Sequence, residues 1–237
     1  MSIEIKNIVK KYGKKVALND VSLTLENGIY GLLGENGAGK STLLNIMVTS
    51  LAQTSGQVLY NGMDIRDKKS GYLDTLGYMP QTPKFYKNYT ACEFLKYIAA
   101  LKGIKKNVNA KTDELLALVN LTESKDVKLG AYSGGMLQRI GIAQALLNDP
   151  EILILDDSSS ALDYRTDASL RRALSESLSS STKITVAQRV SSVKDCDLIL
   201  VLEDGELLAK GTHEELLSVC REYKEISDSQ MGGAFVE

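Results

Sequence analysis

A chain of 237 residues, 43% apolar and 24% charged, is long enough for one compact core with an attached subdomain, and this composition excludes a disordered or fibrous protein. The formal net charge of −2 comes from basic and acidic residues that are mixed along the chain, so we expect no nucleic acid partner. Three cysteines without metal-ligand spacing argue against a disulfide framework or a zinc site, and no apolar run approaches the roughly 18–20 residues that span a bilayer, so we expect a cytoplasmic protein.

Residues 1–82 predict the first part of an α/β core together with an antiparallel β subdomain. Alternating apolar residues predict strands over 3–8 and 21–25, and Asn61-Gly62 is typical of a hairpin turn. Between them, the segment 28–47 reads GIYGLLGENGAGKSTLLNIM and runs from an apolar strand through a glycine-rich loop into a helix.

Residues 83–149 change to a helical pattern, which predicts a helical subdomain inserted into that core. Periodic apolar residues predict a helix that ends at Gly103, a shorter helix over 112–121, and a third helix that begins at Ser133 and stops before Pro150.

The α/β pattern resumes over residues 150–226, and residues 227–237 form a predicted tail. Strands are predicted at Ile152–Asp156 and Lys183–Gln188, followed by a hairpin that turns at Asp204-Gly205. The chain therefore forms a single predicted domain in which the helical subdomain interrupts the core.

The segment Gly34–Ser41, GENGAGKS, fits the phosphate-loop pattern G-x-x-x-x-G-K-[S/T] after a strand and before a helix. Glycines let backbone N–H groups face a phosphate, Lys40 adds a positive charge, and Ser41 can place its hydroxyl on Mg²⁺. The sequence thus predicts a P-loop NTPase with a RecA-like core, whose nucleotide contacts come from Gly34, Asn36, Gly37, Gly39, Lys40, Ser41 and Thr42.

Two acidic residues end the strand that begins at Ile152. Asp156 can place its carboxylate on the metal, and Asp157 follows it directly. Because adjacent residues at a strand end diverge, Asp157 can face an attacking water while Asp156 serves the metal. The alternative is a pair of solvated aspartates that cap the next helix.

The segment AYSGGMLQR, residues 131–139, places Ser133 at a predicted N-cap before two glycines. Such a helix start is receptive to anions, although a simple capped helix has the same pattern.

These motifs, in this order and spacing, resemble the nucleotide-binding domain of ATP-binding cassette (ABC) transporters over nearly the whole chain. The resemblance implies ATP as the nucleotide, adenine stacking on Tyr12, and a Q-loop glutamine, Gln81, near Mg²⁺ and the membrane partner. It implies a signature made by Ser133, Gly134 and Gly135, and a D-loop at the dimer interface made by Ser160, Ala161, Leu162 and Asp163. It also implies a head-to-tail homodimer or heterodimer with another cassette, and a membrane permease to which the chain is peripheral.

Two parts of the chain resemble different branches of that family. Residues 1 to about 155 are similar to separate ATP-binding subunits of drug and peptide exporters, whereas the part from Asp156 onward is similar to half-transporters, in particular to the degenerate member of heterodimeric exporters. A chimera joined near Ile152–Asp156, natural or built, explains this difference, and so does a single divergent natural subunit.

Two residues depart from the family pattern. Asp157 stands where Glu is usual, and Gln188 stands where a γ-phosphate-sensing His is usual. A carboxylate withdrawn by about 1 Å can lower a rate on the order of 10²-fold, and a glutamine amide cannot become cationic. The histidine of the chain, His213, is predicted on the surface after a hairpin. We therefore expect an exporter subunit that binds Mg·ATP and hydrolyses it slowly.

Other functions compete with this interpretation. A non-transport cassette working on ribosomes or in DNA repair usually carries two cassettes or a long coiled-coil insertion, and this sequence has neither. A binding module, such as a recombined cassette that takes up nucleotide without coupled transport, fits the chimera hypothesis.

Overall fold

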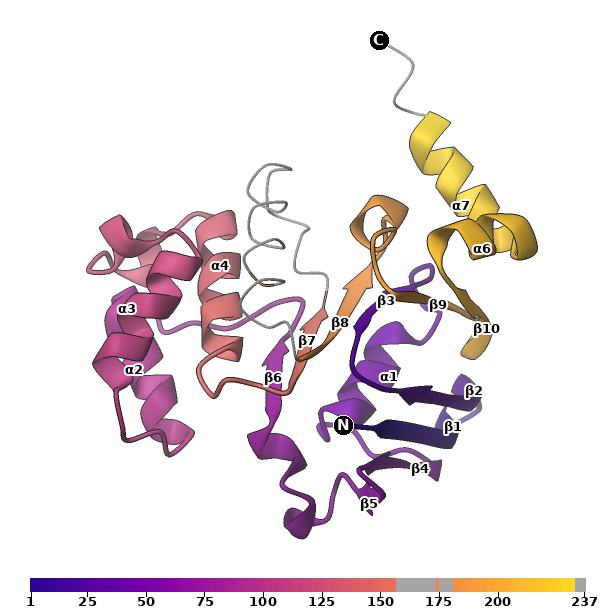
Figure 1. The fold of residues 1–237 in the computed structure, drawn as a ribbon, viewed down its shortest axis with the longest axis horizontal. Helices are drawn as coiled ribbons and strands as arrows, with labels where there is room; N and C mark the ends of the chain where they lie inside the picture. The colour runs from indigo at the N-terminus through magenta and orange to yellow at the C-terminus, as the bar shows by residue number, and fades with distance from the viewer. Residues whose placement is uncertain (157–173, 175–180, 233–237) are drawn as a thin grey trace. The chain divides into compact units, whose positions relative to one another are not determined.

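The computed structural model describes residues 1–156, 174 and 181–232 (Figure 1). Contacts divide the chain into a first unit, Met1–Leu73 with Thr182–Glu237, and a second unit, Asp74–Ser181. Five predicted site residues lie outside the described residues: Asp157, Ser160, Ala161, Leu162 and Asp163.

The first unit contains an antiparallel sheet in the order β2-β1-β4-β5. Its strands are β1 (Ile3–Tyr12), β2 (Lys15–Leu25), β4 (Ser55–Tyr60) and β5 (Met63–Asp64). Asn61 and Gly62 join β4 to β5 with φ angles of 49° and 82°, the left-handed backbone that a two-residue hairpin turn needs. The predicted β subdomain and its hairpin are therefore confirmed.

A second group of strands in the first unit has the order β10-β9-β3-β8. These strands are β3 (Ile29–Leu33), β8 (Thr182–Ala187), β9 (Leu198–Glu203) and β10 (Glu206–Gly211). β3 runs parallel to β8 with Leu33 opposite Ala187, so the loops that follow these two strands leave the sheet at the same edge. Helix α1 (Lys40–Met47) follows β3 through the glycine-rich loop.

Two C-terminal helices, α6 (His213–Val219) and α7 (Arg221–Gly232), cover part of that sheet. Apolar residues of these helices and of the strands form one core. Its buried members are Leu33, Ala187, Val190, Val193, Ile199, Val201, Leu216, Cys220 and Tyr223. His213 is half-buried rather than on the surface, because its Nδ1 lies 2.7 Å from the hydroxyl of buried Tyr223. Burial, together with the nearby Cys196 thiol, raises the pKa of Tyr223 to about 12.

Helix α7 continues through residue 227, where the sequence predicts the start of a tail. Ser227 is only 1% exposed, and Ile226 packs against the core that α7 shares with the sheet. Buried contacts therefore hold this segment in the first unit.

The described residues of the second unit, 74–156, 174 and 181, include two strands and three α-helices. β6 (Leu76–Met79) runs parallel to β7 (Ile152–Asp156), and the helices are α2 (Ala91–Leu101), α3 (Val108–Leu118) and α4 (Gly134–Ala145). The two units also contain short 3₁₀ helices, at Lys68–Ser70, Tyr72–Asp74, Thr122–Ser124, Leu129–Ala131 and Val190–Ser192.

Two glycines allow α4 to approach β6 closely. A Cβ atom at Gly77 would lie 2.3 Å from the carbonyl oxygen of Ala145, and one at Gly141 would lie 3.3 Å from the side chain of Met79. This close contact packs α4 against β6 within the second unit.

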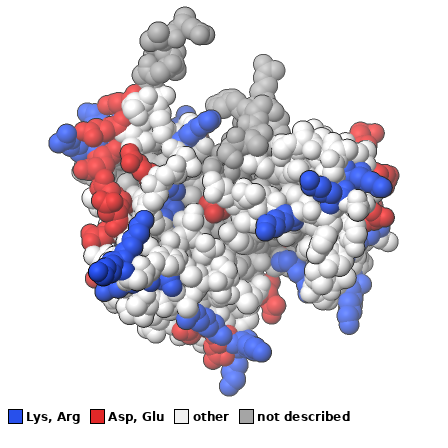
Figure 2. All heavy atoms as spheres, turned by 180° about the vertical axis from the view of Figure 1, so that it is seen from behind, with Lys and Arg blue, Asp and Glu red and all other residues white. Residues whose placement is uncertain are grey.

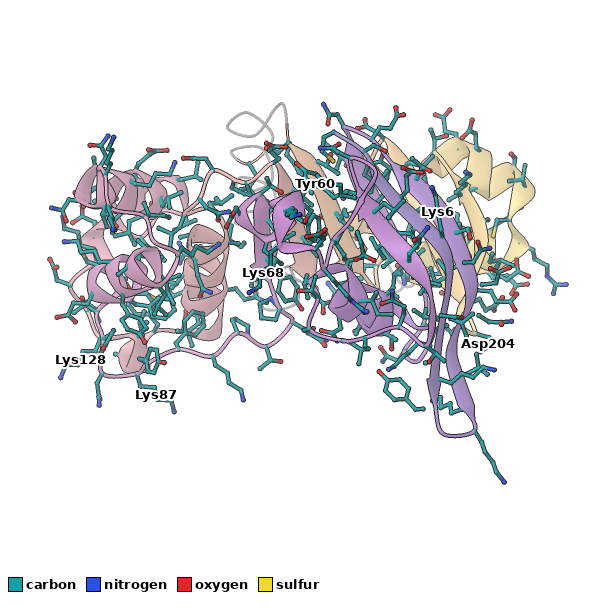
Figure 3. All side chains as sticks on the ribbon, turned by 90° about the horizontal axis from the view of Figure 1, so that it is seen from below. Lys6, Tyr60, Lys68, Lys87, Lys128 and Asp204 are labelled. Atoms are coloured by element: carbon teal, nitrogen blue, oxygen red, sulfur yellow. The ribbon has the colours of Figure 1, made fainter. Side chains whose placement is uncertain are left out.

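Main-chain hydrogen bonds fix the loop before α4. Leu129 N donates to Tyr89 O at 2.9 Å and Gly130 N donates to Lys87 O at 3.0 Å. The side chains of Lys87 and Lys128 point outward from this unit (Figure 3). Hydrogen bonds to the main chain of residues 87–89 thus fix the segment that leads into α4.

Charged side chains of both signs lie on the face shown in Figure 2. Among the described residues, no helix has the length and apolarity needed to cross a membrane.

The N-cap of α2 gives a stability prediction. Thr90 Oγ1 accepts from Glu93 N at 3.1 Å, and the Glu93 carboxylate accepts from Thr90 N at 2.8 Å. Thr90→Ala should lower the free energy of unfolding by about 1 kcal/mol, because α2 loses a reciprocal cap. Urea unfolding would measure the change, with Thr122→Ala at an exposed position as the control. Equal effects of the two substitutions would contradict the capping role.

Candidate functional site

The glycine-rich loop takes its shape from a left-handed residue at its end. Gly39 has a φ of 103°, and a Cβ atom there would lie 2.7 Å from the carbonyl oxygen of Ala17. Only glycine combines this backbone with this approach. The N-cap residue of α1 is Gly39, which makes no side-chain cap, so backbone groups carry the positive end of the helix dipole, as in phosphate-binding helices.

Lys40 lies inside the curl of the loop. Its Nζ donates to the carbonyl oxygens of Gly34, at 2.7 Å, and Glu35, at 2.8 Å, and the residue is 8% exposed. Ser41, the next residue of α1, is exposed. The loop thus combines a fixed cation, a helix N-terminus and an accessible hydroxyl, which is the set of groups that binds nucleotide phosphates.

The tip of the β9–β10 hairpin is tied to the same loop. Gly205 N donates to Ala38 O at 3.1 Å, and Gly205 O accepts from Asn19 N at 2.8 Å. Gly205 has a φ of 84°, and a Cβ atom there would lie 2.8 Å from the carbonyl oxygen of Ala17. The hairpin therefore joins the phosphate loop to β2 through its main chain.

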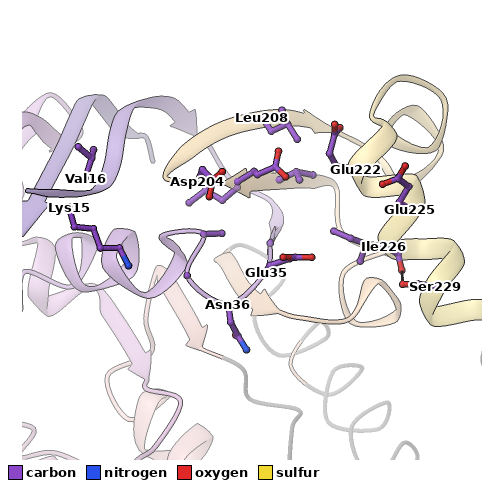
Figure 4. A pocket seen from close by; sticks show the side chains of 16 residues that line it. Lys15, Val16, Glu35, Asn36, Asp204, Leu208, Glu222, Glu225, Ile226 and Ser229 are labelled. Carbon is purple, nitrogen blue, oxygen red and sulfur yellow. Dashed lines mark hydrogen bonds between the residues drawn. The ribbon is translucent and has the colours of Figure 1, made fainter.

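A groove of about 690 Å³ runs along the outer side of the loop (Figure 4). Glu35 points toward Ile226 of α7, whereas Asn36 points away from that helix. The groove is lined by Lys15, Val16, Gly34, Glu35, Asn36, Gly37, Ala38, Val201, Leu202, Glu203, Asp204, Leu208, Glu222, Glu225, Ile226 and Ser229.

Gln188 lies beside the phosphate loop, at the end of β8. The strand ends at Ala187, one residue earlier than the sequence predicts, so Gln188 is the first residue of the loop and is exposed. A cavity of about 400 Å³ is lined by Gln188 together with Leu33, Gly34, Glu35, Asn36, Ile226, Ser229 and Gln230. A side chain at position 188 can therefore reach the space next to the phosphate loop.

Helix α7 contributes residues to this region that the sequence prediction missed. Ile226 and Gln230 line the cavity, although residues 227–237 were expected to form a tail. The spacing of Tyr223, Ile226 and Gln230 over two helical turns was the available signal, because residues three, four and seven apart share one helix face.

Tyr12 ends β1 in the first unit and is 50% exposed. The Nζ of Lys10 lies 4.9 Å from the centre of the Tyr12 ring, a cation–π distance. An exposed, oriented aromatic ring is suited to stack on a purine base.

In the second unit, Asp156 and Gln81 leave the same edge of the β6–β7 pair. Met79 lies opposite Leu155, so Asp156 at the end of β7 and Gln81 two residues after β6 follow parallel strands at their carboxyl ends. Asp156 is 7% exposed. Burial raises the pKa of the neighbouring Tyr78, and the negative charge of Asp156 raises it further.

The signature segment forms the start of α4, as the sequence predicts. Ser133 is the N-cap, and its Oγ accepts from Met136 N at 3.3 Å. Ser133 and Gly134 are exposed and Gly135 is partly exposed, so a group outside the chain can reach this helix N-terminus.

The oxygen donors predicted for Mg²⁺ suit that ion. Mg²⁺ is usually held by one or two carboxylates, a hydroxyl and the phosphates of the substrate, and the predicted ligands Ser41, in the first unit, and Asp156 and Gln81, in the second, carry side-chain oxygen atoms. No cluster of three or more His, Cys, Asp or Glu residues that could hold a metal occurs in residues 1–156, 174 and 181–232.

Comparison with known proteins agrees with this reading. The family model for ABC transporters matches residues 18–160, more than half of the chain. The bacitracin transport ATP-binding protein BcrA of Enterococcus faecalis is 34% identical over 242 residues, which cover 99% of this chain and 78% of BcrA.

Solved structures show the same fold. A bacterial Atm1-family ABC exporter with ATP bound matches with a TM-score of 0.88 and 27% identity over 100% of this chain and 42% of the exporter chain. The dimeric structure of MJ0796, a bacterial ABC transporter cassette, matches with a TM-score of 0.81 and 26% identity over 89% of this chain and 98% of that one. The predicted fold is confirmed: a P-loop core with an antiparallel β subdomain and a helical subdomain. The chain therefore belongs to the ABC transporter family, as one of its ATP-binding cassettes.

Proposed function

We propose that the chain is the Mg·ATP-binding subunit or domain of an ABC exporter and that its own site hydrolyses ATP slowly. The observation that carries this proposal is the position of Lys40. Its ammonium group lies inside the loop, bonded to the carbonyl oxygens of Gly34 and Glu35, at the start of α1. BcrA is by name a bacitracin transport ATP-binding protein, and this likeness supports a role in transport.

Each group has a defined task in this function. The loop from Gly34 to Thr42 binds the phosphates, and Tyr12 stacks on the adenine. Ser41, Gln81 and Asp156 hold Mg²⁺, which neutralises phosphate charge when it is bound.

Slow hydrolysis follows from the two departures from the family pattern. Asp157 orients the attacking water with a carboxylate that is one methylene shorter than Glu, and general-base assistance is typically worth about 10²–10⁴-fold in rate. Gln188 contacts the γ-phosphate through a neutral amide that cannot become cationic. Neither residue belongs to the phosphate loop, so ATP binding is retained.

A second cassette completes the site. In a head-to-tail dimer, Ser133, Gly134 and Gly135 of this chain close on the ATP of its partner, and the D-loop at 160–163 crosses the interface. The exposure of Ser133 at the N-terminus of α4 supports this arrangement, as does the dimer of the related cassette MJ0796. In a homodimer both ATP sites are slow. In a heterodimer, a partner cassette with Glu and His at the positions of Asp157 and Gln188 has a fast site, which the signature of this chain completes. A membrane permease in a separate chain is the further partner.

A recombined cassette that binds nucleotide without coupled transport is the alternative. The chimera hypothesis places the junction between its two parent sequences near residues 152–156. The similarity to BcrA spans both sides of this segment and covers 99% of the chain, which favours one divergent cassette.

The first test concerns ATP binding. Lys40→Ala should weaken ATP binding roughly 10- to 100-fold, because charge-assisted hydrogen bonds to the phosphates are lost. Lys87→Ala, at an exposed position in the second unit, is the matched control. Titration calorimetry with Mg·ATP measures both, and equal affinities in the two variants would refute the assigned phosphate loop.

The second test concerns hydrolysis. At saturating Mg·ATP, the double variant Asp157→Glu, Gln188→His should turn over ATP about 10²-fold faster than the parent chain, because the longer carboxylate and the titratable imidazole are restored. A parent that is already as fast as its variant would refute slow hydrolysis. If both chains bind ATP and neither hydrolyses it, the binding-module alternative is supported instead.

The third test concerns the adenine platform. Tyr12→Ala should weaken ATP binding about 10-fold, since stacking of a base on an aromatic ring is worth roughly 1–3 kcal/mol. Tyr12→Phe keeps the ring and should bind like the parent. Inorganic triphosphate, which has no base, should bind all three chains equally. A loss of triphosphate affinity in Tyr12→Ala would mean that this residue acts by another route.

A further inference from the structure

Gln230 of helix α7 is hydrogen-bonded to the loop that carries Gln188. Gln230 Nε2 donates to the carbonyl oxygen of Gln188 at 2.9 Å, and Gln230 Oε1 accepts from Val190 N at 2.8 Å. One amide thus binds the main chain on both sides of Arg189. Only one orientation of the amide satisfies both bonds, because a carbonyl needs a donor and an N–H needs an acceptor.

These two hydrogen bonds fix the main chain directly after the last residue of β8. The strand ends at Ala187 and a 3₁₀ turn begins at Val190, so Gln188 and Arg189 form the connection between them. In a sheet, a neighbouring strand would pair with such backbone groups. Here the amide of Gln230 pairs with them instead and fixes the course of the loop.

The loop fixed in this way lies next to the phosphate loop. Gln188 and Gln230 line one cavity of about 400 Å³ together with Gly34, Glu35 and Asn36. A shift of the main chain at Gln188 therefore moves its side chain relative to the phosphate loop.

Helix α7 is firmly held at its other contacts, so it can serve as a fixed support. Tyr223 is 0% exposed and Ser227 is 1% exposed, and the hydroxyl of Tyr223 lies 2.7 Å from Nδ1 of His213. Tyr223, Ser227 and Gln230 lie on one face of the helix at positions i, i+4 and i+7.

We propose that Gln230 is a positioning residue for ATP hydrolysis, which holds the main chain at Gln188 and Val190 so that residue 188 meets the γ-phosphate. This inference rests on the proposed function, because it assigns the hydrolysis of ATP to the same site. Gln230 acts on the rate through the loop and leaves the groups that bind ATP unchanged.

The test replaces Gln230 with leucine, which keeps a similar volume and removes both hydrogen bonds. In Gln230→Leu, the amide of Val190 should exchange with deuterium at least about 10-fold faster, because it loses its acceptor. The kcat for ATP should fall about 10-fold while KM changes less than about 2-fold, since a small misplacement lowers the rate and the phosphate loop is untouched. Lys224→Leu, at an exposed position on the same helix, is the matched control and should change none of these values.

The outcomes separate this proposal from the proposed function. Unchanged exchange at Val190 in Gln230→Leu overturns the proposal, and so does faster exchange with an unchanged kcat. A rise of KM that equals the fall of kcat also overturns it, because Gln230 would then act on binding. If the parent shows no turnover, the proposed hydrolysis fails, and faster exchange at Val190 in Gln230→Leu still supports the holding of the loop. Thermal unfolding of both leucine variants checks that the first unit remains folded.

Discussion

The placement of the Lys40 ammonium is the interaction on which the site depends. Two carbonyl oxygens, of Gly34 and Glu35, converge on Nζ, and the loop curls around it. This curl requires Gly39 in a left-handed conformation at the point where the loop meets α1. The carbonyl dipoles thereby turn toward the lysine, and the positive start of α1 remains for an anion. A buried β3 strand before the loop gives it a rigid base.

Binding and hydrolysis are assigned to different residues in this cassette. The phosphate loop and Tyr12 follow the pattern of a nucleotide-binding protein, whereas the departures fall at Asp157 and Gln188, to which we assign the step that transfers the phosphate. Affinity and rate can therefore change independently, because interactions made equally in the ground state and the transition state do not raise kcat. Under the proposed function, such a cassette contributes its signature to a faster partner while it retains its own ATP.

The sequence predicts those parts of the structure that local rules decide. The left-handed pair Asn61-Gly62 makes a hairpin, Ser133 caps α4, and the glycine-rich loop joins a strand to a helix, all from patterns within a few residues. Contacts between distant segments were harder to predict. The approach of α4 to β6 at Gly77, and the burial of His213, depend on residues that the local pattern does not bring together.

The same limit applies to the site. Gln188 was identified from the family pattern, at the end of a predicted strand, but its main-chain contact with Gln230 joins segments 42 residues apart. Residues 227–237 were expected to form a tail, whereas α7 continues through Gly232. Tyr223 packs in a core with residues of the sheet, and Ser227 is also buried, so tertiary contacts rather than helix propensity hold this segment as a helix.

The tie between the β9–β10 hairpin and the phosphate loop has a consequence for ligand discrimination. Gly205 bonds to Ala38 on one side and to Asn19 of β2 on the other, and β2 pairs with β1, which ends at Tyr12. A continuous main-chain framework therefore sets the separation between the aromatic ring and the loop. With Tyr12 as the proposed adenine platform, this framework fixes the length from base to phosphate, and a ligand with a shorter or longer spacer cannot satisfy both ends at once. Because this length is fixed when the protein folds, little conformational entropy remains to be lost when the nucleotide binds.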